Sequence, residues 1–147
     1  MIKEQERELI IGMMELNYVG DFLDDKREEK RTISSKNWKI YERDLKNNVK
    51  EGKGIYYYIN GNKYEGNWKN NVKEGEGTLS EDYGNIYKGD WKSNVKGGKG
   101  IYYYINGNKY VGEWKNDFKE EKGILYNDYG KIYEGVWKHD VKMEKEY

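Results

Sequence analysis

The chain repeats itself along its 147 residues, and this repeat limits its possible folds more than any other feature. The segment Gly-Lys-Gly-Ile-Tyr-Tyr-Tyr-Ile-Asn-Gly-Asn-Lys-Tyr occurs at 52–64 and again at 98–110. The two copies are 46 residues apart, and a shift of half that distance, 23 residues, brings most of the chain into register. A period of this size is typical of repeat proteins in which each unit is one supersecondary element. Six units then begin with a tyrosine, at Tyr18, Tyr41, Tyr64, Tyr87, Tyr110 and Tyr133.

Each unit has the pattern of a β-hairpin. Tyr64, Gly66 and Trp68 are two residues apart, which places them on one face of a strand. A second stretch rich in β-branched and aromatic residues precedes them at 54–59, and Asn-Gly at 60–61 is a strong hairpin turn signal. Glycine on the aromatic face leaves room for a neighbouring ring to lie across the backbone, although it could instead mark a bulge. Because a lone hairpin is marginal in water, we expect the units to pair side by side.

The motif Tyr-x-Gly-x-Trp, with a further glycine nine residues after the tryptophan, resembles the MORN repeat (membrane occupation and recognition nexus). Units beginning at 64, 87 and 110 carry every residue of the motif. The unit from Tyr41 departs from it, with Arg43 and Leu45 in place of Gly and Trp, and the last unit stops at Tyr147 after one strand. The resemblance implies an elongated, single-layer antiparallel meander with a grooved face. It implies no single activity, since such arrays occur in junctophilins, phosphatidylinositol-phosphate kinases and ciliary scaffolds.

We therefore expect an all-β fold of about six 23-residue hairpin repeats over residues 18–147. Residues 1–17 lie outside the repeat, and we expect them to form a short helical or strand cap over the first hairpin, because open repeat arrays need a protected edge. Adjacent units differ more from each other than alternate units do, so the pattern also has a longer period of two units. Such an alternating surface could hold one register with a partner.

Composition narrows the function. The 27 basic and 27 acidic side chains cancel, which argues against a nucleic-acid partner, and the absence of cysteine excludes thiolate metal sites. His139 is the only histidine, so no hydroxyl has the usual partners of a catalytic nucleophile. We expect no enzyme activity, no cofactor and no metal. A cytoplasmic location is the default expectation, with membrane or cytoskeletal association left open.

Aromatic side chains are the main candidates for partner binding. Because a single layer cannot cover both of its faces, some rings should remain accessible to a protein partner or a second copy. Packing of ring on ring within the array is the alternative, and we favour it for the tryptophans. The candidates are Tyr56, Tyr57, Tyr58, Tyr102, Tyr103, Tyr104, Trp68, Trp91 and Trp114.

Lysines recur at two positions of the unit and form two basic columns with acidic columns beside them. They suggest phosphoinositide or membrane-surface binding, although a solvated face with cross-strand charge pairs explains them as well. The sixth position gives the lipid candidates Lys69, Lys92, Lys115 and Lys138, and the tenth gives Lys50, Lys73, Lys96, Lys119 and Lys142. The sequence thus predicts a non-catalytic scaffold with an aromatic groove for a helix, a peptide or a second copy. Lipid binding is the alternative, and a structural spacer in a cytoskeletal or ciliary assembly is a further one.

Overall fold

A computed structural model describes residues 7–11, 14–19, 22–23, 26–27, 32–35, 40–47 and 49–144, with side chains for 47 and 49–144. The chain falls into two compact units, Met1–Val72 and Lys73–Tyr147, and each is described by itself. Every regular element among the described residues is a strand, so the all-β prediction is confirmed.

The first unit contains eight described strands. Of these, six pair antiparallel in the order β1-β2-β5-β6-β7-β8, while β3 and β4 pair with each other. Within segment 1–17, the described residues are strand rather than helix. The bounds are β1 (Arg7–Ile11), β2 (Met14–Val19), β3 (Phe22–Leu23), β4 (Lys26–Arg27), β5 (Thr32–Ser35), β6 (Ile40–Lys46), β7 (Val49–Tyr57) and β8 (Lys63–Lys69).

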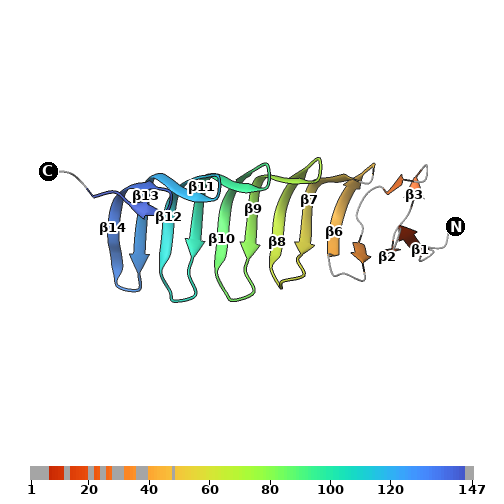
Figure 1. Cartoon of the computed structure of the whole chain (residues 1–147), viewed down its shortest axis with the longest axis horizontal. Coiled ribbons are helices and arrows are strands. Elements are labelled where there is room, and N and C mark those ends of the chain that lie inside the picture. Colours follow the sequence, from red (N-terminus) through yellow and green to blue (C-terminus); the bar gives the residue numbers. More distant parts are fainter. Residues whose placement is uncertain are drawn as a thin grey trace. The chain divides into compact units, whose positions relative to one another are not determined.

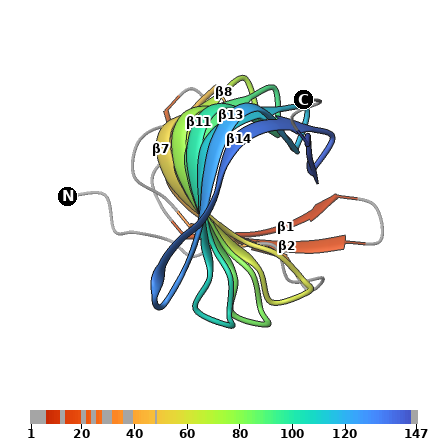
Figure 2. The ribbon, with the colours of Figure 1, turned by 90° about the vertical axis from the view of Figure 1, so that its left-hand side faces the viewer.

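In the second unit, each strand pairs antiparallel with the next one along the chain, which makes an open meander (Figure 1). Figure 2 shows that β11, β13 and β14 bend in the same way, so the sheet of this unit is strongly curled. The strands are β9 (Val72–Ser80), β10 (Ile86–Lys92), β11 (Val95–Tyr103), β12 (Lys109–Lys115), β13 (Phe118–Asn127), β14 (Gly130–Lys138) and β15 (Val141–Lys142).

Tight two-residue turns join the two strands of the repeats that begin at 64, 87, 110 and 133. Both central residues have positive φ, as at Ser93 (46°) and Asn94 (72°), which identifies the turns as type I′. This turn matches the natural twist of paired strands, and Asn and Asp tolerate its left-handed backbone. The same geometry recurs at 70–71, 116–117 and 139–140. It fixes which residues of the hairpin face each other, so that Trp91 lies opposite Lys96.

The tyrosines that open the repeats at 87, 110 and 133 lie directly on glycine backbone. Tyr87 has no exposed surface, and a Cβ added to Gly100 would lie 2.5 Å from its ring. The Tyr87 hydroxyl donates a hydrogen bond to the Asp90 carbonyl (2.8 Å), where a bulge interrupts the pairing of β10 with β11. The prediction that these glycines make room for a ring is confirmed, and the bulge lies one residue further along.

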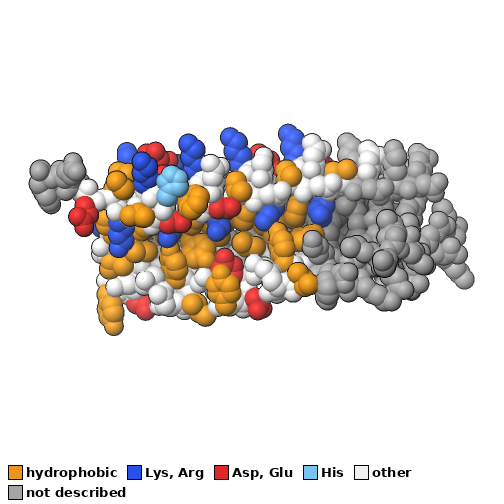
Figure 3. Space-filling model, in the orientation of Figure 1, with side chains coloured by type: hydrophobic (Ala, Val, Ile, Leu, Met, Phe, Trp, Pro, Cys, Tyr) orange, Lys and Arg blue, Asp and Glu red, His pale blue; other side chains and the backbone are white. Residues whose placement is uncertain are grey.

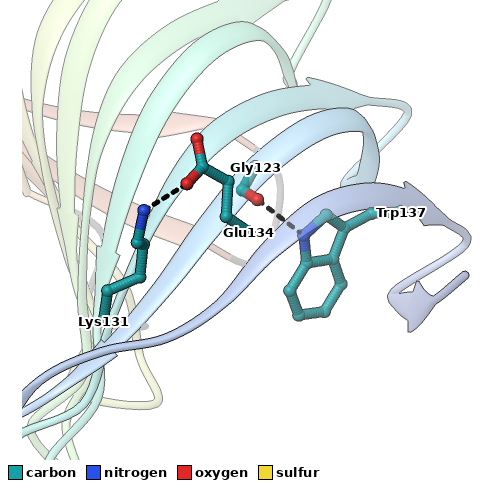
Figure 4. Close-up of polar contacts among 4 residues, drawn as sticks. All are labelled: Gly123, Lys131, Glu134 and Trp137. Atoms are coloured by element: carbon teal, nitrogen blue, oxygen red, sulfur yellow. Dashed lines mark hydrogen bonds and ion pairs between the residues drawn. The ribbon is translucent and has the colours of Figure 1, made fainter. Parts of the chain in front are cut away.

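The tryptophan of the motif connects neighbouring repeats. The Trp91 indole Nε1 donates to the Gly77 carbonyl (3.2 Å), and Trp137 makes the equivalent bond to Gly123 (3.2 Å), which Figure 4 shows. Each tryptophan ring also meets tyrosine rings edge-on, as where Tyr87 lies 5.3 Å from Trp91. Trp114 breaks the pattern, because its Nε1 is buried without a hydrogen-bond partner among the described residues. These rings form the core of the sheet, on what we call the inner face.

Candidate functional site

Lysines at the tenth position of the repeat lie on the inner face, among the aromatic rings. The Lys96 Nζ lies 5.3 Å from the Tyr87 ring centre and 5.1 Å from those of Tyr102 and Trp114. At these distances a cation is attracted by the faces of the rings. We call four residues of the second unit the inner lysines: Lys73, Lys96, Lys119 and Lys142.

The arrangement repeats with the period of the chain. The Lys119 Nζ lies 5.2 Å from the ring centres of Tyr104 and Trp137 and 5.4 Å from that of Tyr110. The Lys73 Nζ lies 4.4 Å from the Trp91 ring. Figure 3 shows lysines and hydrophobic side chains side by side over the strands of the second unit.

Burial changes the protonation of two of the inner lysines, Lys73 and Lys96. It lowers the pKa of Lys73 to about 8, an effect that the nearby charge of Lys96 increases and that of Asp117 opposes. Burial also lowers the pKa of Lys96, although the carboxylates of Asp117, Glu81 and Asp140 act in the opposite direction. These two ammonium groups have therefore lost part of their hydration.

A polar cluster lies beside Lys96 on the same face. The Tyr102 hydroxyl donates to Glu81 Oε2 (2.8 Å), and Asn85 Nδ2 lies 3.0 Å from both that oxygen and the hydroxyl. Burial and this bond to a carboxylate raise the pKa of Tyr102. For Glu81, burial alone would raise the pKa, but the hydrogen bonds from Tyr102, Tyr83 and Asn85 outweigh it and leave the pKa below its ordinary value. Glu81 is thus a charged group whose oxygens are already in use.

The structure divides the aromatic candidates into three groups. Trp68, Trp91 and Trp114 belong to the core, with no more than 5% of each exposed. Tyr56, Tyr58, Tyr102 and Tyr104 are half-buried on the inner face, where Tyr102 and Tyr104 meet edge-on at 4.8 Å and Tyr56 and Tyr58 at 4.7 Å. Tyr57 and Tyr103 point to the opposite face, the outer face, because they alternate with the inner tyrosines along the strand.

The four lipid candidates lie elsewhere. Lys69, Lys92, Lys115 and Lys138 are each exposed, at the entrance to a type I′ turn. Lysines of the sixth position alternate with the buried tryptophans along the strand, so they belong to the outer face. The two basic columns expected from the sequence are therefore separated by the sheet. The four lipid candidates are exposed, whereas the inner column is half-buried except for Lys142.

Acidic residues beside the turns have a structural role. The Glu74 carboxylate accepts a hydrogen bond from the Ser93 backbone N–H (2.8 Å) in the next repeat. Asn94 and Lys73 exchange two further bonds, from the Asn94 N–H to the Lys73 carbonyl (3.0 Å) and from the Lys73 N–H to Asn94 Oδ1 (2.8 Å). Some of the acidic side chains thus connect successive turns by hydrogen bonds rather than binding a ligand.

The position of the inner lysines was missed at the sequence level, although one signal could have found it. A two-residue turn at the seventh and eighth positions places the tenth residue opposite the fifth, which is the tryptophan. Directly opposed residues of an antiparallel pair share a face. Counting through the turn would therefore have placed these lysines on the aromatic face.

Within the residues that the structure describes, no group of three or more His, Cys, Asp or Glu side chains is arranged to hold a metal ion. The described part of the chain also has no helix with the length and hydrophobicity of a membrane span.

Comparison with protein families agrees with the geometry. The MORN repeat model matches residues 44–63, 64–82, 87–109 and 110–131, which together make up more than half of the chain. No curated protein matches the chain. MORN repeats are generally associated with protein and membrane-lipid interactions. On the evidence of the four matches and of the Tyr-Gly-Trp stacking described above, the chain belongs to the MORN-repeat family.

Proposed function

We propose that this chain is a non-catalytic binding module that holds a partner protein on its inner face. The observation that carries the proposal is the division of the aromatic rings. The tyrosines and tryptophans of the motif are buried against glycine, whereas Tyr102 and Tyr104 are only half-buried and are not needed for that stacking. Such rings supply large contact area at low entropic cost, which is why they are common at interface hot spots. The partner is a helix, a peptide or a second copy of the chain.

Capture of partners by the tagged protein tests this proposal. We expect Tyr102→Ser with Tyr104→Ser to lose the proteins that the wild type retains, because both rings lie on the inner face. Tyr103→Ser is a matched control, since Tyr103 comes from the same strand but points to the outer face and is 37% exposed. Equal retention by the inner-face variant and the wild type would contradict the proposal, provided that tryptophan fluorescence shows both variants folded.

Lipid binding remains the second candidate, because Lys69, Lys92, Lys115 and Lys138 are all exposed. Co-sedimentation with phosphoinositide vesicles separates it from the first. Binding through these lysines should weaken as salt is raised and should be lost when all four are changed to Gln. A structural spacer in a cytoskeletal or ciliary assembly, the third reading, predicts self-association without either activity.

A further inference from the structure

The inner lysines supply positive charge on a face that is lined mainly by aromatic rings and that also carries the Glu81 cluster. Among the described residues, neither Lys96 nor Lys119 forms an ion pair. Each ammonium is held instead by three rings at 5.1–5.4 Å. Beside Lys96, the Glu81 carboxylate already accepts hydrogen bonds from Tyr102 and Asn85, and the Asp117 carboxylate accepts one from the Lys96 backbone N–H. The rings therefore hold these two ammonium groups in place, but no carboxylate of the described residues lies within ion-pair distance of them.

Their spacing follows from the fold. Equivalent residues of successive repeats are two strands apart, which is about 9.6 Å at the usual strand separation. In an α-helix, side chains seven residues apart lie on nearly the same face and about 10.5 Å apart. In an extended strand, residues three apart would span a similar length but would point to opposite sides. A helix therefore matches the lysine column, and over four lysines the mismatch of about 3 Å is within reach of long side chains.

We propose that the inner face of residues 73–144 binds an acidic amphipathic helix of a partner protein, with a carboxylate at every seventh residue pairing with one inner lysine. The apolar side chains of that helix contact the half-buried rings of Tyr102 and Tyr104. This inference rests on the proposed function and adds the charge and the register of the partner. Helix-in-groove recognition commonly combines such periodic anchors with an apolar face.

The shape of the inner face and the burial of its lysines favour an acidic helix over an anionic membrane. Lys73, Lys96 and Lys119 are half-buried among rings on a strongly curled sheet, whereas a bilayer is flat (Figure 2). A membrane would first meet the exposed lysines at the turn entrances, such as Lys92 and Lys115. A carboxylate at the end of a flexible side chain can reach into the face, and pairing with a partly desolvated ammonium is stronger than pairing on an exposed surface.

Fluorescence anisotropy with designed peptides tests the inference on the full chain. The probe is a labelled helix of four heptads built from Leu, Ala and one Glu per heptad. One control peptide has Gln in place of each Glu, and a second has the Glu residues moved out of the heptad register. The protein variants are Lys96→Gln with Lys119→Gln, and Lys92→Gln with Lys115→Gln, which change the net charge equally on opposite faces. A third variant, Lys96→Met with Lys119→Met, keeps the apolar contacts of the side chains if the Gln pair fails to fold.

We expect the heptad peptide to bind and the inner-lysine variant to weaken binding about 100-fold, or about tenfold for each lysine. The turn-entrance variant should change the affinity by less than about threefold, as expected for exposed charges. Equal loss in both variants would overturn the inference, as would absence of binding by the heptad peptide or equal binding of the peptide with displaced Glu. Equal binding of the Gln peptide would overturn the charge pairing while leaving the proposed binding face intact. Vesicle binding that is lost in the inner-lysine variant would assign the lysines to lipid instead.

Discussion

Replacing Gly100 by Ala tests directly whether the fold depends on rings that lie on glycine backbone. Gly100 and Gly97 both belong to β11, and neither has a positive φ. A Cβ at Gly100 would lie 2.5 Å from the Tyr87 ring, whereas a Cβ at Gly97 would meet only the Lys92 Cβ, at 3.5 Å. Since carbon atoms pack at about 3.5–4.0 Å, the Tyr87 ring must move by about 1 Å or more in the first variant and not at all in the second.

The expected cost can be worked out from these contacts. Overpacking of a tight core costs about 1–3 kcal/mol. Displacing the ring also strains the bond from the Tyr87 hydroxyl to the Asp90 carbonyl, which adds about 1 kcal/mol. Alanine recovers about 0.5–1 kcal/mol in either variant, because glycine loses more backbone entropy on folding. Gly100→Ala should therefore destabilise the protein by about 1–3.5 kcal/mol, while Gly97→Ala should be neutral or slightly stabilising.

Urea unfolding followed by tryptophan fluorescence measures this difference. Because a repeat array can unfold in parts, hydrogen exchange of the β10 and β11 amides should be measured alongside. In a Tyr87→Leu background the two alanine variants should differ by much less, since the obstructing ring is gone. If Gly100→Ala and Gly97→Ala lie within about 0.5 kcal/mol of each other in the wild-type background, the ring-on-glycine explanation is wrong.

Three further predictions follow from the geometry. Trp91→Phe loses the hydrogen bond to the Gly77 carbonyl, whereas Trp114→Phe removes a buried donor without a partner. The first variant should therefore lose about 1–2 kcal/mol more stability in urea unfolding than the second. Equal losses would contradict this reading. The pKa of Lys73 is about 8 in the fold and 10.5 ordinarily, so the unfolded chain holds more protons between these values. Thermal stability should therefore rise with pH across that window and rise less in Lys73→Met. The melting temperature should then fall at more alkaline pH, because burial raises the pKa of Tyr58 from 10.0 to about 12; a flat profile would exclude both shifts. Asn94→Gly, which keeps the left-handed backbone of the turn, should cost about 1 kcal/mol in urea unfolding through loss of the Lys73 N–H bond. The control is Asn106→Gly, which loses only a bond within its own turn.

Much of the fold could be predicted from the sequence, because the residues that carry it act locally. The alternation of Tyr87, Gly89 and Trp91 determines a strand and its buried face, and Asn and Asp pairs determine the turns. The family resemblance rests on these same residues, and for that reason the fold class and the family were both predicted correctly. The strand structure of β1 was left open at the sequence level, since apolar spacing in such a short segment suits a helix or a strand equally.

The candidate site was harder to predict, because it depends on how strands face each other across turns. Whether a lysine at the tenth position meets water or a tryptophan depends on the number of turn residues. A shift of one residue would move that lysine to the other face. The bond missing at Trp114 and the curl of the sheet depend on small displacements that no residue pattern specifies.

The chain has a period of one repeat and a longer period of two repeats. The first contains the residues that folding requires, and the second contains differences that a partner could recognise. Tyrosine, glycine and tryptophan at the stacking positions, with the inner lysines, recur every 23 residues, because each repeat must dock on its neighbour in the same way. The strand that carries Tyr102 and Tyr104 alternates with one that carries Leu125 and Asn127 at the equivalent positions. Stacking tolerates this alternation, since Leu125 pairs with Tyr133 just as Tyr102 pairs with Tyr110. A partner helix on residues 73–144 would then meet lysines once per repeat but a single tyrosine pair, Tyr102 and Tyr104. One carboxylate per heptad would set its position along the face, and contact with that one pair would distinguish one register from the next.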